Sequence, residues 1–177
     1  MNELEANVEK YFRMLHPDFD QLESGEQWIA SYDRDFLREN LYEIDSKFLR
    51  NSLAEIPGQK KQSPTEILKM VLAGVRSEKH FHILHPDYER MSDSEKWKAL
   101  DDQMFLFNHD DEVNKEYYKL RGEARYVREE EPNPQECMRQ AVENVKAREE
   151  QSKQENNQQL STEENNQEQS TDDNDER

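Results

Sequence analysis

The sequence predicts an all-α protein: two tandem, duplicated helix–loop–helix units that form a small helical bundle, followed by a disordered acidic C-terminal tail. Three observations predict this class. Glycine is scarce, at four of 177 residues, and no stretch alternates apolar and polar residues as a strand would. Apolar residues recur instead every three to four positions, as on one face of a helix. A shift of 69 residues also aligns one long stretch of the chain with another.

The first repeat is expected over residues 1–56. Pro17 should end its first helix near His16, because proline disrupts a helix interior. Ser24 and Gln27 have the spacing of a capping box, which would start the second helix. The apolar face of the first helix comprises Leu4, Val8, Tyr11, Phe12 and Leu15. The second helix continues the stripe through Trp28, Tyr32, Phe36, Leu41, Ile44 and Phe48.

A linker is expected over residues 57–63, and a second repeat over 64–131. Ser63 can cap the helix that Pro64 begins, since proline suits the first helical position. The pair Asn133-Pro134 then opens a C-terminal helix, expected over 132–148. The apolar side of this last helix comprises Met138, Ala141, Val142 and Val145.

The duplication rests on an ungapped alignment of residues 9–50 with 78–119, in which 14 of 42 positions are identical. The identities include the "LHPD" motif and a tryptophan in each repeat. Helical patterning alone would not keep these residues in register. We therefore expect both repeats to share one backbone, with Trp28 and Trp97 in equivalent, partly buried positions.

Residues 149–177 have a different composition. They contain ten acids, two bases, no aromatic residue and one large aliphatic residue, Leu160. Such a segment cannot bury enough apolar surface to offset the entropy lost on ordering. We expect a disordered tail, which either solubilises the protein or attracts a basic partner.

The net charge of −17 argues against direct binding to nucleic acid or to an anionic membrane, because Lys and Arg supply most of that affinity. A single cysteine, Cys137, excludes an internal disulfide and suits a reducing compartment. The sequence shows no signal-peptide pattern and no apolar run of bilayer length. We expect a cytoplasmic protein.

The repeated His-Pro-Asp tripeptide has two interpretations. It is either a helix corner, in which proline stops the helix and aspartate caps the next turn, or a binding loop. A binding loop requires its histidine and aspartate to face solvent. The candidate partner-binding residues are His16, Pro17, Asp18, His85, Pro86 and Asp87.

A helix, a loop with His-Pro-Asp and a further helix resemble the J domain of DnaJ-type co-chaperones, most strongly over residues 78–124. The segment "EKWKALDDQMFLF" is similar to the family's "KFKEIxEAYxxL", and "NKEYYKLRGEA" to its closing "RRxYDxYGxA". Trp97, Leu100, Met104 and Phe107 fall on the family's apolar positions. The resemblance implies an Hsp70-like partner that contacts the tripeptide. In the family the preceding helix is basic, whereas Glu78 lies there in this chain, which favours a degenerate J-like adaptor over an active co-chaperone.

The sequence contains no Gly-rich phosphate loop, nucleophile elbow or HExxH pattern. His85, His109, Asp110 and Asp111 could bind a metal only if their loops meet. We therefore expect no enzymatic activity, cofactor or metal. Two functions stay open: a non-enzymatic, acidic helical protein-interaction module, or an acidic regulator or decoy of a basic nucleic-acid-binding protein, of the kind that mobile elements encode.

Overall fold

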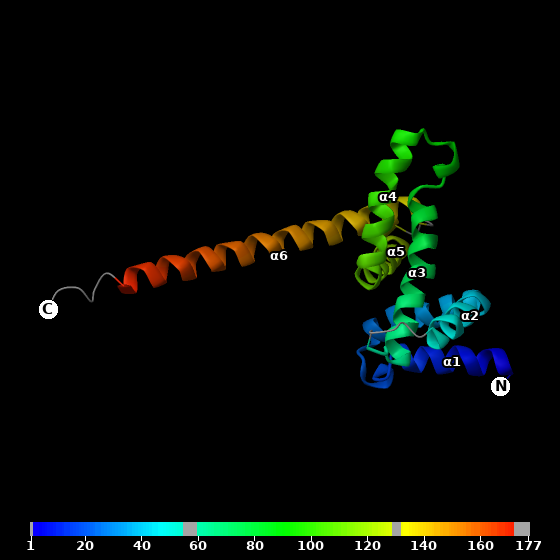
Figure 1. The fold of residues 1–177 in the computed structure, drawn as a ribbon. Coiled ribbons are helices and arrows are strands. Elements are labelled where there is room, and N and C mark those ends of the chain that lie inside the picture. The colour runs from blue at the N-terminus through cyan, green and yellow to red at the C-terminus, as the bar shows by residue number, and fades with distance from the viewer. Residues whose placement is uncertain (1, 55–59, 129–131, 172–177) are drawn as a thin grey trace.

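The protein is all-α across residues 2–54, 60–128 and 132–171, the parts of the chain that the computed structural model describes (Figure 1). Residues 1 and 55–56 of the predicted first repeat, 57–59 of the predicted linker, 129–131 of the predicted second repeat and 172–177 of the predicted tail lie outside these parts. The elements in chain order are α1 (Glu3–Leu15), the 3-10 helix η1 (Phe19–Gln21), α2 (Ser24–Leu53), α3 (Pro64–Leu84), the 3-10 helix η2 (Tyr88–Arg90), α4 (Asp93–Asn108), α5 (Asp110–Arg128) and α6 (Pro134–Thr171).

The second helix of each repeat begins with a capping box. In α4 the box consists of Ser92 and Glu95. In α2 it consists of Glu23 and Glu26, one residue before the predicted box that begins at Ser24. Ser24 is already the first helical residue, so its side chain is not at the capping position. The corrected box restores the 69-residue register between the repeats.

The backbone of the two corners is nearly the same. His16 has φ −127° and ψ 68°, and His85 has φ −123° and ψ 67°. Asp18 and Asp87 follow at φ −100°, ψ 19° and φ −99°, ψ 17°. Each corner then makes one turn of 3-10 helix before the next helix starts. We call residues 2–50 the first unit and residues 71–119 the second unit.

The units also bend at equivalent places. Asn40 leaves helical geometry inside α2, at φ −119° and ψ 15°. His109, which is 69 residues later, has φ −117° and ψ 28° and separates α4 from α5. One bent helix in the first unit therefore corresponds to two helices in the second, and the backbone confirms the duplication.

Two hydrophobic cores lie along α3. The first core combines α1, α2 and the N-terminal half of α3, up to Val75. The second combines the rest of α3, from Phe81, with α4, α5 and α6. The predicted boundary at residues 57–63 therefore does not separate two packing units, because α3 belongs to both.

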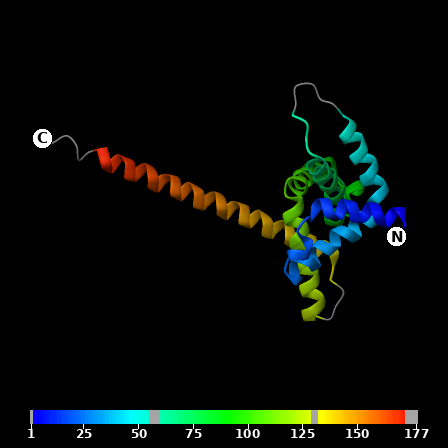
Figure 2. The ribbon, with the colours of Figure 1, turned by 90° about the horizontal axis from the view of Figure 1, so that it is seen from below.

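The last helix, α6, completes the core of the second unit, as the N-terminal half of α3 completes the core of the first. It begins at Pro134, as predicted, and its first turns fill the second core with Met138, Ala141, Val142 and Val145. It does not end at residue 148. Residues 149–171, which belong to the predicted tail, continue α6 away from the bundle as a single helix (Figures 1 and 2).

Both tryptophans occupy the fifth position of their helix, so their secondary-structure context is equivalent. The predicted equivalence does not extend to their burial, because α5 covers part of Trp28 and no described helix covers Trp97 in the same way. Trp28 is 41% exposed and Trp97 is 72% exposed. The core faces of these helices contain Ala30 and Ala99. A residue two positions before the core residue lies about 200° around the helix, and therefore on the outer side.

Candidate functional site

The histidine of each His-Pro-Asp corner points toward the following helix. Nε2 of His16 lies 2.8 Å from Oδ2 of Asp33, and Nε2 of His85 lies 3.0 Å from Oδ2 of Asp102. A carboxylate only accepts hydrogen bonds, so the ring nitrogen donates in both pairs. Asp33 and Asp102 are equivalent in the 69-residue register. Each histidine thus ties its corner to the next helix.

The other two residues of each corner face solvent. Pro17 and Asp18 are exposed, as are Pro86 and Asp87. The aspartate side chains make no capping bond, and backbone bonds such as the one from Arg90 N–H to Asp87 C=O close the 3-10 turn. The structure therefore differs from each interpretation in one respect. The histidines point inward, which the binding loop did not predict, and the aspartates do not cap, which the helix corner did not predict.

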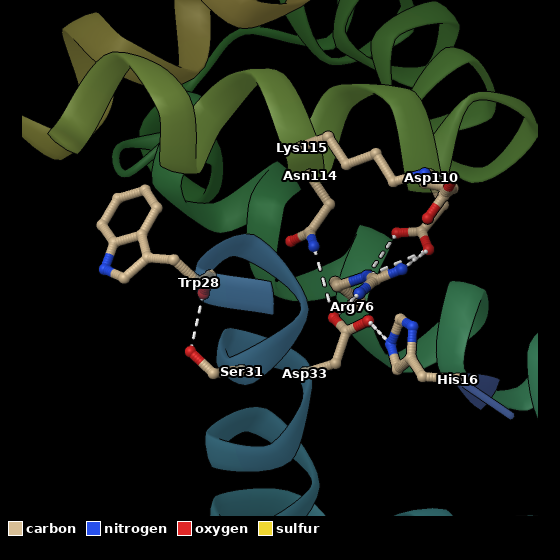
Figure 3. A network of polar contacts seen from close by, with 9 residues as sticks. His16, Trp28, Ser31, Asp33, Arg76, Asp110, Asn114 and Lys115 are labelled. Carbon is tan, nitrogen blue, oxygen red and sulfur yellow. Dashed lines mark hydrogen bonds and ion pairs between the residues drawn. The ribbon is translucent and has the colours of Figure 1, made fainter. Parts of the chain in front are cut away.

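A buried polar network centred on Arg76 joins the two units (Figure 3). The guanidinium donates to Asp33 of α2 through Nη1, and its Nε lies 3.0 Å from both carboxylate oxygens of Asp110 in α5. Asn114 of α5 donates to Asp33 at 3.4 Å, and His16 donates to the other oxygen of Asp33. The network therefore connects the corner after α1 with α2, α3 and α5.

Charges within this network stabilise one another despite their burial. Burial raises the pKa of Asp33, but Arg76 and His16 outweigh it, so the pKa lies below the ordinary value. Burial lowers the pKa of Arg76, and the two carboxylates more than compensate. For Asp110, burial has the larger effect and raises the pKa, although Arg76 opposes the shift. At neutral pH the guanidinium is charged between Asp33 and Asp110.

His80 lies one turn from Arg76 and is almost fully buried. Burial, and then the positive charge of Arg76, lower the pKa of His80 to about 3, so the ring is neutral at pH 7. Its Nδ1 and Oδ1 of Asn114 have no hydrogen-bond partner among the described atoms. At the equivalent positions of the first unit, the hydroxyl of Tyr11 donates to Asp45.

The second unit repeats part of the network. Nζ of Lys146 lies 3.1 Å from Oδ1 of Asp102, whose other oxygen accepts from His85. Each unit thus links a corner histidine, a helix aspartate and a cation from the helix that closes its core. The spacing from aspartate to cation is 43 residues for Arg76 and 44 for Lys146. Arg76 and Lys146 are therefore 70 residues apart, one more than the offset of the repeats, so the ungapped alignment does not pair them. An alignment that pairs Ser-Pro at 63–64 with Asn-Pro at 133–134 has the offset of 70 and pairs the two cations.

A second contact between the units involves aromatic side chains of α2 and α5. The rings of Tyr32 and Tyr118 stack with their centroids 3.9 Å apart. One turn away, Cη2 of Trp28 lies 2.5 Å from the point where a Cβ of Gly122 would be. Glycine at this position therefore allows α5 to lie across the tryptophan ring.

The residues of the possible metal cluster lie in separate contacts. His85 pairs with Asp102, Asp110 pairs with Arg76, and His109 lies between two glutamates at 3.5 and 3.4 Å. Across the described side chains, no group of three or more His, Cys, Asp or Glu residues could hold a metal ion.

No protein-family model matches the chain, and no curated protein or solved structure matches it either. The similarity to the J domain therefore stays a prediction. Within the described ranges, no helix is both long enough and apolar enough to cross a bilayer.

Proposed function

We propose that this chain is a non-enzymatic helical adaptor that presents its two exposed Pro-Asp pairs to a partner protein. One observation carries this proposal. Residues 17–18 and 86–87 lie exposed between paired helices on nearly identical backbones, while the histidine of each motif is held inward. A loop that is already fixed loses little conformational freedom on binding, which favours recognition.

The resemblance to the J domain makes an Hsp70-like chaperone the first candidate partner. In this proposal Asp18 and Asp87 contact the partner, and His16 and His85 position the corner. The net charge of −17 slows association with an acidic surface and favours a partner whose binding surface is basic.

The test compares Asp87→Asn with Glu89→Gln in the full chain. Both changes remove one exposed carboxylate from the same turn, and both leave an amide of similar size. Proteins from the native host that cross-link to each variant are identified and quantified by mass spectrometry. We expect the Asp87→Asn protein to lose a partner that the Glu89→Gln protein retains. Equal retention by both variants would refute the role of the corners.

The second candidate function is an acidic decoy for a basic nucleic-acid-binding protein. The observation that favours it is the concentration of ten acids against two bases in residues 149–177, which include the projecting part of α6. Truncation after Glu150 should then weaken binding, and the loss should be larger at low salt because exposed charges are less screened. The adaptor predicts no loss on truncation.

A further inference from the structure

An apolar stripe runs along the exposed side of α4. It consists of Trp97, Leu100, Met104 and Phe107, whose spacing of three and four residues places them on one helix face. Trp97 is 72% exposed, Met104 67% and Phe107 45%, and Leu100 is partly buried. The core-facing side of the same helix contains Ala99 instead. The stripe is therefore not part of the second core.

The first unit shows that the fold does not require these apolar residues. Its backbone is the same, and its helix α2 presents the corresponding face. After Trp28, the equivalents of Leu100, Met104 and Phe107 are polar. They are Ser31, Asp35 and Arg38. An apolar stripe that only one of two equivalent helices displays points to binding rather than to folding.

The apolar surface continues from α4 onto α3. The ring of Phe107 lies 3.9 Å from the point where a Cβ of Gly74 would be. Met70 is on the same face of α3, one turn before this glycine, and is 38% exposed. The stripe is thus the centre of a patch that extends over two packed helices.

The structure also contains a template for what could cover Trp97. Its equivalent, Trp28, is covered by α5, and Gly122 accepts the ring. In the second unit, α6 takes the place of α3, but the described chain supplies no helix in the place that α5 takes over Trp28. The missing cover is a helix with a small residue opposite the tryptophan.

A second copy of this chain is a poor occupant. Each copy has a net charge of −17, so two copies repel each other. A stripe of four partly exposed side chains is also small beside the roughly 800 Å² that each partner buries in a typical stable complex. Asp101 lies exposed on the same face between Trp97 and Met104, and its charge favours a cationic ligand.

We infer that the stripe binds an amphipathic helix of a basic partner protein, with a glycine over Trp97 and apolar residues over Leu100, Met104 and Phe107. Helices that dock in this way use apolar anchors at positions i, i+3, i+4 and i+7. This surface is separate from the Pro-Asp corners, so the two proposals can fail independently.

The test uses a defined probe in place of the unknown partner. The probe is a synthetic helical peptide with leucines at helical spacing, a central glycine and lysines at both ends, and its match carries glutamates at the ends. The Trp28→Phe protein leaves Trp97 as the only tryptophan, so its fluorescence reports binding. The disruptive variant, Met104→Asp/Phe107→Arg, transfers the residues of the first unit. Tyr42→Asp, at a position 91% exposed outside the stripe, is its control.

We expect saturable binding of the lysine peptide, at least about tenfold weaker binding by the Met104→Asp/Phe107→Arg variant, and unchanged binding by Tyr42→Asp and Asp87→Asn. The variant should keep the wild-type thermal midpoint. The inference is overturned if the lysine peptide does not bind, if both peptides bind equally, or if the variant binds as well as wild type. A dimer in sedimentation that this variant abolishes would make a second copy the occupant and overturn it too.

Discussion

The contribution of Arg76 to stability depends on the burial of its ion pairs. Its guanidinium is buried between Asp33 and Asp110, whereas Lys146, the equivalent cation of the second unit, is partly exposed beside Asp102. Removing one member of a buried ion network leaves the others charged and without compensation. Removing one member of an exposed pair leaves its partner in water.

We therefore expect Arg76→Met to lower the free energy of unfolding by about 3–5 kcal/mol. The matched change, Lys146→Met, should cost at most about 1 kcal/mol. Urea denaturation of both variants at pH 7 measures the difference. Similar costs for the two would show that Arg76 does not hold the units together as the contacts indicate.

His80 should make the stability of the protein depend on pH. Its folded-state pKa of about 3 lies below its ordinary value of 6.5, so the unfolded state binds more protons between these values. Stability is therefore fully present above pH 6.5 and falls as the pH drops below it. Between pH 7.5 and pH 5, the free energy of unfolding of His80→Phe should fall by about 2 kcal/mol less than that of wild type. His82→Phe, a change at an exposed position, serves as the control. Parallel pH profiles for wild type and His80→Phe would contradict this.

At the scale of the elements, the contact between α2 and α5 depends on a glycine inside a helix. Alanine normally stabilises a helix interior by up to about 1 kcal/mol relative to glycine. A Cβ at residue 122 would displace the ring of Trp28, which lies 2.5 Å away. The same substitution should therefore have different effects with and without the tryptophan.

A double-mutant cycle measures this coupling. Gly122→Ala should stabilise the Trp28→Ala protein by up to about 1 kcal/mol and should stabilise wild type less, or destabilise it. Thermal denaturation gives the four values of the cycle. If the two effects are the same, the ring does not rest on α5.

Most helix starts and stops were predictable because they follow local rules. Proline ended α1 and α3 near the corner histidines, and Pro134 began α6. The side of each helix that faces its partners was less predictable. Trp28 and Trp97 continued the apolar pattern but lie outside the cores, because alanines occupy the core face. Periodicity defines an apolar stripe without indicating whether another element covers it.

The polar network was not predictable from the sequence. His16 and His85 were identified as candidate site residues, but their aspartate partners lie 17 residues further along the chain and meet them only in the fold. Arg76 was hidden inside an apolar helix pattern, where buried charges are rare. The corner tripeptides were recognisable because they are repeated, whereas the direction of each side chain depends on tertiary packing.

At the scale of the whole molecule, α3 joins both cores, while the C-terminal part of α6 projects from the bundle (Figure 1). Glu149 lies 3.4 Å from His109, the most C-terminal ion pair with the bundle among the described side chains. Truncation after Glu150 should therefore change the thermal midpoint by less than about 2 °C. A drop of many degrees in calorimetry would show that the removed segment packs on the bundle.

The central claim is that each corner is held by an inward contact between histidine and aspartate, while the aspartate of the tripeptide stays exposed and makes no capping bond. The most direct measurement is the free energy of unfolding of Asp102→Asn and Asp87→Asn in urea. Asp102 accepts from His85 and Lys146, so its change should cost about 1–2 kcal/mol. Asp87 is exposed and makes no capping bond, so its change should stay within about 0.5 kcal/mol of wild type. A cost for Asp87→Asn that equals or exceeds the cost for Asp102→Asn would contradict the claim.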